Sequence, residues 1–124
     1  MQEKTIIWDG ASGKKYRYWI GPIDSTFKEE PGNYVFVREV RPGVYEAIYA
    51  GEAGDLADRL DNPNSHHKIG CIRAEGATHL CTHTTEGAPQ ARRDEESDII
   101  ARWKPPCNDQ AKGKARRSFS QITS

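Results

Sequence analysis

Residues 33–51 contain two stretches in which apolar and polar side chains alternate, separated by a short turn. The stretches are residues 33–40 (NYVFVREV) and 44–51 (VYEAIYAG), and the turn is Arg41-Pro42-Gly43. Alternation with a period of two is typical of β-strands, and proline followed by glycine favours a tight turn between them. We therefore predict a β-hairpin that any fold of this chain must contain.

The rest of the chain adds strands and helices. Apolar alternation resumes on both sides of a glycine-rich break, Leu56 and Leu60 lie four residues apart as on one helix face, and Pro105 ends a long helical stretch. These patterns predict an N-terminal hairpin over residues 6–20, a short helix over 55–60, a strand over 77–84 and a helix over 88–103. Strands and helices in this order predict an α+β fold built on an antiparallel sheet.

Composition narrows the class of protein. The chain has 124 residues, of which 35% are hydrophobic and 29% charged, so one small domain is expected. No run approaches the roughly 18 to 20 apolar residues of a membrane helix, and the start does not resemble a secretory signal. The three cysteines, Cys71, Cys81 and Cys107, are an odd number without CxxC spacing, which argues against a disulfide scaffold or a zinc ribbon. We therefore expect a reducing, cytoplasmic location.

Charges balance overall, with 18 Lys and Arg against 18 Asp and Glu, but they are unevenly placed. Residues 110–124 carry four basic residues and no acidic one, whereas residues 1–109 carry a net charge of −4. We expect this basic tail to be largely disordered, and it either solubilises the chain or contacts a phosphate backbone. The chain is thus divided into an N-terminal hairpin and linker (residues 1–29), a folded domain (residues 30–109) and the tail (residues 110–124).

The helix predicted over residues 88–103 carries an acidic side chain on its apolar side. At 100° per residue, the face set by the isoleucines and the tryptophan near its end also contains Glu96, while Glu95 lies farther from the centre of that face. A carboxylate in such a place is costly unless it is paired or used. Two alternatives follow: an ion pair between Arg92 and Glu96 at the helix edge, or a functional carboxylate.

Several short motifs occur in a set order along the chain. Gly32-Asn33-Tyr34 begins one predicted strand, Tyr49-Ala50-Gly51 ends its partner, Arg59 follows on the short helix, and Glu96 precedes Asn108 by twelve residues. This ordered set resembles the GIY-YIG nuclease superfamily, in which each motif alone is weak but the order is specific. The resemblance covers about residues 30–109, and it extends to small single-domain bacterial members with an extra N-terminal hairpin.

The resemblance implies a fold, an activity and partners. The fold is a GIY-YIG-like three-stranded antiparallel sheet flanked by helices, with the N-terminal hairpin added, and residues 30–109 are the nuclease domain. The activity is hydrolysis of DNA phosphodiester bonds by an endonuclease that uses Mg²⁺ or Mn²⁺. DNA is the partner, and a second protein that supplies specificity is a further expectation.

The resemblance also assigns roles to residues. A carboxylate can hold a hard divalent cation, a guanidinium presents paired donors to a phosphate, and a phenol can take part in proton transfer. The implied catalytic set is Tyr34, Tyr49, Arg59, His66, which we prefer over His67, and Glu96, which is also the metal ligand. The implied substrate-positioning set is Gly32, Gly51 and Asn108. Which tyrosine is the general base stays open.

Each of these residues also has a purely structural interpretation. Strand tyrosines are commonly half-buried, Arg59 can pair with Asp55 on the helix surface, and loop histidines are usually solvated. A domain of net charge −4 is also poorly suited to bind DNA alone. The alternative function is therefore a non-catalytic nucleic-acid-binding or assembly module on the same fold, and a nuclease would need a special DNA structure, a partner or its basic tail.

Two features depart from the family pattern. The two tyrosines are separated by 14 residues, which predicts a longer hairpin around its Pro-Gly turn. In addition, Glu52 follows Gly51 directly, and an acid there would raise the pKa of a neighbouring tyrosine. Activation of a tyrosine as a base would then have to come from the metal or a histidine.

Overall fold

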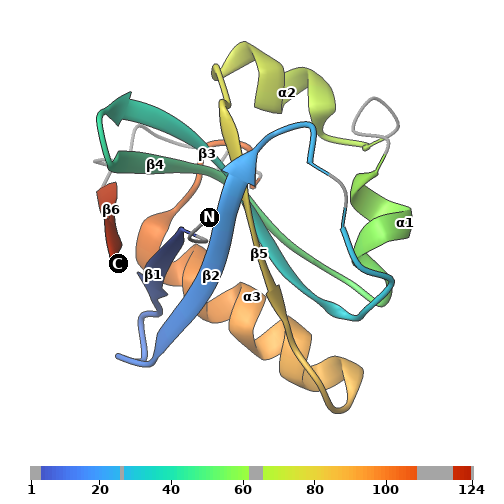
Figure 1. The fold of residues 1–124 in the computed structure, drawn as a ribbon. Coiled ribbons are helices and arrows are strands. Elements are labelled where there is room, and N and C mark those ends of the chain that lie inside the picture. Colours follow the sequence, from blue (N-terminus) through green and yellow to red (C-terminus); the bar gives the residue numbers. More distant parts are fainter. Residues whose placement is uncertain (1–3, 26, 62–65, 109–118, 124) are drawn as a thin grey trace.

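Antiparallel strands form one closed sheet in the computed structural model, which describes residues 4–25, 27–61, 66–108 and 119–123. The strands are β1 (Thr5–Asp9), β2 (Lys15–Pro22), β3 (Gly32–Arg41), β4 (Val44–Ala53), β5 (His79–Thr84) and β6 (Phe119–Thr123). Their order is β1-β2-β5-β3-β4-β6, and β6 also pairs with β1, so the sheet closes into a barrel (Figure 1).

The predicted α+β fold is confirmed. β3 and β4 form the central hairpin, and β5 pairs with β3, which gives the three-stranded core of the expected sheet. The N-terminal hairpin of β1 and β2 joins this core directly, because β2 pairs with β5, with Trp19 opposite Thr82 and Pro22 opposite His79. The hairpin therefore extends the same sheet.

The described residues contain the helices α1 (Leu56–Leu60), α2 (Ile69–Ala74) and α3 (Pro89–Trp103). α1 begins at Asp55, whose carboxylate accepts a hydrogen bond from the Asp58 amide at 3.1 Å and so satisfies one of the free N–H groups of the first turn. α3 ends at Lys104, which adopts a left-handed conformation (φ 48°) just before Pro105. None of these helices is long and apolar enough to cross a membrane.

Two elements were not expected from the sequence. α2 is a six-residue helix that contains Gly70, and its sequence, IGCIRA, is too short to show a clear helical period. β6 lies within the tail for which we expected disorder, so that expectation is wrong for residues 119–123, which pair with β4 and β1. Backbone pairing at the sheet edges stabilises β6 despite its polar sequence. The rest of the tail, residues 110–118 and 124, lies outside the described residues.

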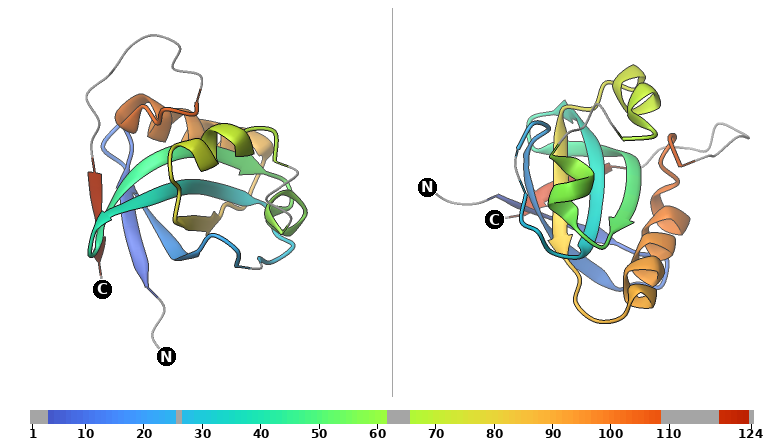
Figure 2. Two further views of the ribbon diagram at one scale, coloured as in Figure 1. Left: turned by 90° about the horizontal axis from the view of Figure 1, so that it is seen from above. Right: turned by 90° about the vertical axis from the view of Figure 1, so that its right-hand side faces the viewer.

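The sheet carries an apolar cluster on each face. Successive residues of a strand point to opposite faces, so Val35 and Val37 join a cluster that α3 covers, whereas Tyr34 and Phe36 join a cluster that includes residues of α1 and α2. Figures 1 and 2 show α3 apart from the other two helices. We call the second side the α1–α2 face, and the predicted site residues lie there and at its border with α3.

Candidate active site

The two predicted tyrosines lie side by side on neighbouring strands. Tyr34 of β3 and Tyr49 of β4 have ring centroids 6.2 Å apart, and the side chain of Tyr34 is fully buried while Tyr49 is 8% exposed. Gly51 stands opposite Tyr34 across the hairpin, and a Cβ atom there would lie 2.4 Å from the tyrosine ring. The glycine of the second motif therefore makes room for the tyrosine of the first.

Gly32 has a similar packing function at the start of β3. A Cβ atom there would lie 2.3 Å from the carbonyl oxygen of His83 on β5 and 2.8 Å from a methyl group of Leu56 on α1. The absence of a side chain lets the strand and the helix approach closely. Both glycines, which the sequence predicted as substrate-positioning residues, thus place the tyrosine-bearing strands.

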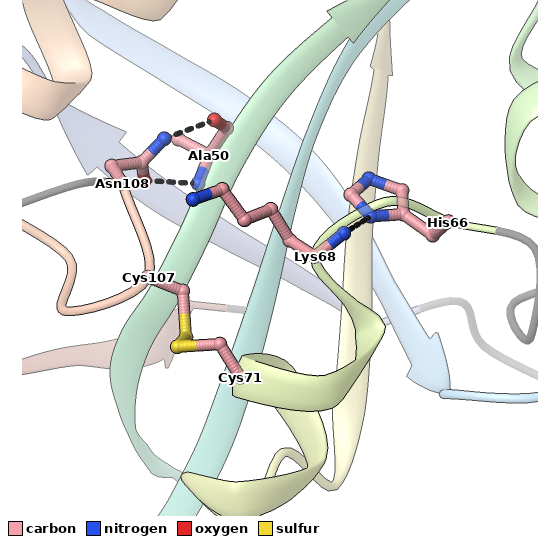
Figure 3. Close-up of a disulfide and its surroundings, with 6 residues drawn as sticks. All are labelled: Ala50, His66, Lys68, Cys71, Cys107 and Asn108. Atoms are coloured by element: carbon pink, nitrogen blue, oxygen red, sulfur yellow. Dashed lines mark hydrogen bonds between the residues drawn. A yellow bond between two sulfur atoms is a disulfide. The ribbon is translucent and has the colours of Figure 1, made fainter.

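His66 contacts the first tyrosine. Its Nε2 atom lies 2.8 Å from the Tyr34 hydroxyl oxygen. Its Nδ1 atom accepts a hydrogen bond from the Lys68 amide at 3.0 Å, as Figure 3 shows. Burial, assisted by the nearby His67 and Arg59, lowers the pKa of His66 to about 4, so the ring is neutral at pH 7. Because Nδ1 is an acceptor, the single ring proton is on Nε2, which donates to Tyr34.

His67 occupies a different environment from His66. It is exposed, and its ring stacks on His66 with centroids 4.7 Å apart. The structure therefore brings His66, the histidine that we preferred, into contact with Tyr34 and places its neighbour at the surface.

Arg59 projects from α1 toward the tyrosines. Its guanidinium donates to the Glu52 carbonyl at 3.2 Å, and its charge opposes the increase that burial causes in the pKa values of Tyr34 and Tyr49. The alternative surface pair with Asp55 does not form, since the Asp55 carboxylate caps α1 instead. Arg59 is exposed at one edge of the cluster, where it can meet an anion from solvent.

Glu96 lies on α3 at the border of the α1–α2 face. Burial, followed by the charge of Glu52, raises the pKa of Glu96, and the charges of Arg59 and Arg93 oppose this increase. Glu96 makes no ion pair with any of the described residues, because Arg92 pairs instead with Glu52 at 2.9 Å. The alternative of an Arg92–Glu96 pair is therefore wrong, and a half-buried carboxylate without a direct cationic partner stands beside Arg59.

The helix phase expected for α3 needs a correction. Glu95, not Glu96, faces the core, with 5% exposure, and it accepts hydrogen bonds from the Tyr18 hydroxyl (2.5 Å) and from His83 Nδ1 (2.9 Å). The buried residues Glu95, Ile99 and Trp103 are spaced four apart, so the centre of the core stripe lies one position from where we placed it. This four-residue spacing was present in the sequence, but its first position is a glutamate, so hydrophobicity alone did not reveal it.

Burial holds both tyrosines in their protonated form. It raises the pKa of Tyr34, with Tyr49 as the next cause, and it raises the pKa of Tyr49, with Glu96 as the next cause. We expected Glu52 to be the acid responsible, but its carboxylate is paired with Arg92 and influences the pKa values of Glu96 and Arg59 instead. The Tyr34 hydroxyl opposes part of the increase in the pKa of Tyr49.

The Asn108 side chain binds the backbone of β4 through two hydrogen bonds. Its side-chain oxygen accepts from the Ala50 amide at 2.7 Å, and its side-chain nitrogen donates to the Ala50 carbonyl at 2.8 Å (Figure 3). Ala50 lies between Tyr49 and Gly51, so the amide expected to position substrate holds the second motif in place.

A disulfide joins Cys71 of α2 to Cys107, the residue before Asn108 (Figure 3). The cysteine pattern, which argued against a disulfide scaffold, did not indicate this single bond. The partners are 36 residues apart, a spacing that indicates nothing in the sequence, and the fold alone brings them together. Cys81 is free and buried. The segment that carries His66 is thereby tied to the segment that carries Asn108.

Comparison with solved structures identifies the fold. The chain is similar to two structures of the GIY-YIG N-terminal endonuclease domain of UvrC from Thermotoga maritima, each a tyrosine-to-phenylalanine mutant bound to its catalytic divalent cation. Identity is 27% and 28%, the TM-score is 0.53 in both cases, and each match covers 67% of this chain and 87% of the other. The chain has the GIY-YIG superfamily fold. No family model and no curated protein matches it.

The close approach of Gly51 to Tyr34 in this GIY-YIG fold predicts the effect of an added methyl group. Gly51→Ala should displace the tyrosine ring and lower the free energy of unfolding by roughly 1–3 kcal/mol, measured by urea denaturation. Gly70→Ala is the control, because no heavy atom lies within 4 Å of a Cβ atom at Gly70. Equal stability of the two variants would show that Tyr34 does not pack over Gly51.

Proposed function

We propose that this protein is a divalent-metal-dependent endonuclease that hydrolyses DNA phosphodiester bonds. The observation that carries the proposal is the convergence of two phenols, a guanidinium and an unpaired carboxylate on one face of a GIY-YIG fold. These groups match what phosphodiester hydrolysis requires: activation of water, a clamp for the phosphate and a ligand for a cation. The similar UvrC domain, an endonuclease, supports the same assignment.

Glu96 would hold the metal, for which we propose Mg²⁺ or Mn²⁺. The carboxylate oxygens of Glu96 suit a hard cation. Glu96 makes no ion pair with another described residue that would compete with the metal for these oxygens. The similar solved structures contain a catalytic divalent cation, which supports a metal at this site. When bound, such a cation polarises a phosphoryl oxygen and lowers the pKa of water.

We assign the role of general base to Tyr49. His66 Nε2 donates to the Tyr34 oxygen, so the Tyr34 hydroxyl proton is free to point to Tyr49. This chain of donors stabilises a phenolate on Tyr49, which has the more exposed ring of the two tyrosines. After losing its own proton to solvent, Tyr49 as a phenolate would accept the proton of the attacking water. Tyr34 and His66 would support it, and Arg59 would hold the phosphate.

The first experiment compares DNA substrates and metal ions. Supercoiled, branched and single-stranded DNA are incubated with the protein in Mg²⁺, in Mn²⁺ and in EDTA. We expect cleavage of at least one substrate that depends on the metal. Binding of DNA without cleavage in either metal would instead favour the non-catalytic nucleic-acid-binding or assembly module.

The role proposed for Arg59 predicts a specific loss of turnover. Arg59→Lys keeps the charge but replaces two parallel donors by one, so the rate of cleavage should decrease roughly a hundredfold, while the melting temperature stays nearly unchanged. Arg41→Lys, at an exposed arginine at the end of β3, is the control. A lower melting temperature with normal specific activity would assign Arg59 a structural role.

We further propose that the protein acts on DNA in the cytoplasm, with specificity supplied in part by a second protein. The Cys71–Cys107 disulfide is more typical of oxidising compartments, so in a reducing cytoplasm it would form only transiently. Alkylation of free thiols at the moment of lysis tests the location. A substantial reduced fraction is expected, and fully oxidised protein in cells would contradict the cytoplasmic assignment.

A further inference from the structure

A cavity of about 390 Å³ opens over β2 and β5, and β5 is the strand next to the one that carries Tyr34. Its lining comes from β2 (Arg17 and Trp19), from the linker after β2 (Phe27 and Lys28), and from β5, including Thr82. Thr82 pairs with Tyr34 on one side and with Trp19 on the other. The cavity therefore begins one strand away from Tyr34 and two strands away from Tyr49. The backbones of Trp19 and Tyr34 are roughly 10 Å apart, which is two strand spacings.

The N-terminal hairpin, which the catalytic set does not use, supplies the aromatic wall of this cavity. The half-buried ring of Trp19 packs edge to face on Phe27, with centroids 6.3 Å apart. The same ring covers Gly21, where a Cβ atom would lie 2.1 Å from it. These contacts hold the indole in one orientation while part of it stays open to solvent.

The cavity also presents positive charge in a domain that is acidic overall. Arg17 is exposed and donates to the Thr5 hydroxyl at 3.0 Å, and neither Arg17 nor Lys28 makes an ion pair with another described residue. Two cations without acidic partners among the described residues, next to a partly exposed aromatic ring, are suited to a ligand that has both a flat ring and a phosphate.

We propose that this cavity binds one unpaired nucleotide of the DNA that flanks the scissile bond. The base stacks on Trp19, and Arg17 and Lys28 contact the adjoining phosphates. A paired base cannot enter a concave pocket of this kind, because both its faces are covered by its neighbours in the duplex. This inference rests on the proposed nuclease function and adds a substrate class, namely DNA with a single-stranded segment next to the cut.

The test measures binding and cleavage separately. Fluorescence anisotropy in EDTA gives the affinity for a 20-base-pair duplex and for the same duplex with a ten-nucleotide unpaired flap. Wild type should prefer the flap substrate, Trp19→Ala should weaken flap binding roughly tenfold without changing duplex binding, and Trp19→Phe should retain the preference. Equal loss on both substrates, or no loss on either, would overturn the proposal.

Charge variants address the same site without removing the packed indole. The double variant Arg17→Ala/Lys28→Ala should flatten the salt dependence of flap binding, by about 0.7 in the log–log slope for each lost phosphate contact. Lys14→Ala, at an exposed lysine in the β1–β2 turn, is the matched control and should leave the slope unchanged. Equal slopes for the double variant and wild type would contradict phosphate contacts at this cavity.

Cleavage assays in Mg²⁺ separate this inference from the proposed function. If the flap DNA is cut and Trp19→Ala neither weakens its binding nor slows its cleavage, the nuclease assignment stands and the nucleotide pocket is wrong. If flap binding depends on Trp19 but no DNA is cut, the pocket stands and the nuclease assignment is wrong.

Discussion

Replacing Glu96 with Gln should lower metal-dependent DNA cleavage by roughly a thousandfold while the fold stays intact. Metal ions contribute several kcal/mol of transition-state stabilisation, and each 1.4 kcal/mol or so corresponds to a factor of ten in rate. The amide keeps the shape of the side chain but is a much weaker ligand for a hard cation. The measurement is the single-turnover rate in saturating Mg²⁺, with Asp94→Asn, an exposed acid on the same helix, as the control.

Thermal unfolding distinguishes loss of metal binding from loss of folding. Added Mg²⁺ or Mn²⁺ should raise the melting temperature of wild type and of Asp94→Asn but not of Glu96→Gln, because only a ligand that binds the native state stabilises it. A fully active Glu96→Gln variant, or one that metal still stabilises, would remove Glu96 from the metal site. If Glu95→Gln loses activity and Glu96→Gln does not, the metal ligand is Glu95.

The raised pKa of Glu96 sets the sign of a stability difference in metal-free protein. A carboxyl group with a raised pKa in the folded state favours folding below its ordinary pKa, and this contribution is lost as the pH rises through the raised value. Glutamine does not ionise, so the Glu96→Gln variant does not lose this stabilisation as the pH rises. The variant should therefore be more stable than wild type at pH 7 in EDTA, and the difference should shrink in acid.

Loss of the disulfide is the second large effect that we expect. Closing a loop of 36 residues removes conformational freedom from the unfolded chain, so breaking the Cys71–Cys107 bond should cost about 3–4 kcal/mol. For a chain of this size the melting temperature should decrease by roughly 10–15 °C. The measurement is thermal unfolding of wild type with and without a phosphine reductant.

Cysteine variants provide the controls for this effect. Cys71→Ala/Cys107→Ala should have the lower stability in both conditions and show no further response to the reductant. Cys81→Ala, which keeps the disulfide, should respond to the reductant as wild type does. A reductant that leaves wild-type stability unchanged would show that the disulfide does not contribute in solution.

Local patterns in the sequence predicted much of the fold. Strand alternation gave both hairpins, the Leu56–Leu60 spacing gave α1, and Pro89 and Pro105 marked the ends of α3. α2 and β6 could not be predicted, because a six-residue helix and a short strand that closes the barrel depend on long-range contacts. The disulfide depends on the same long-range contacts, since it joins residues that only the tertiary structure makes neighbours.

The candidate site was predictable to a similar degree. The order of the motifs led to Tyr34, Tyr49, Arg59 and Glu96, which the structure places close together. The helix phase failed at Glu95, because hydrogen bonds from Tyr18 and His83 make burial of that carboxylate favourable and hydrophobicity alone cannot show this. The Arg92–Glu52 pair was missed for a related reason: its members lie 40 residues apart.

Alternate residues of β3 serve both the α3 cluster and the tyrosine site, and this has a consequence for preparations of the protein. A shift of β3 by one residue would turn Tyr34 toward α3 and Val35 toward the α1–α2 face, so misalignment of the site also disrupts the core. Molecules with a well-packed interior but a misplaced Tyr34 are therefore strongly disfavoured. Specific activity should then follow the folded fraction directly, and it can be used to quantify refolding.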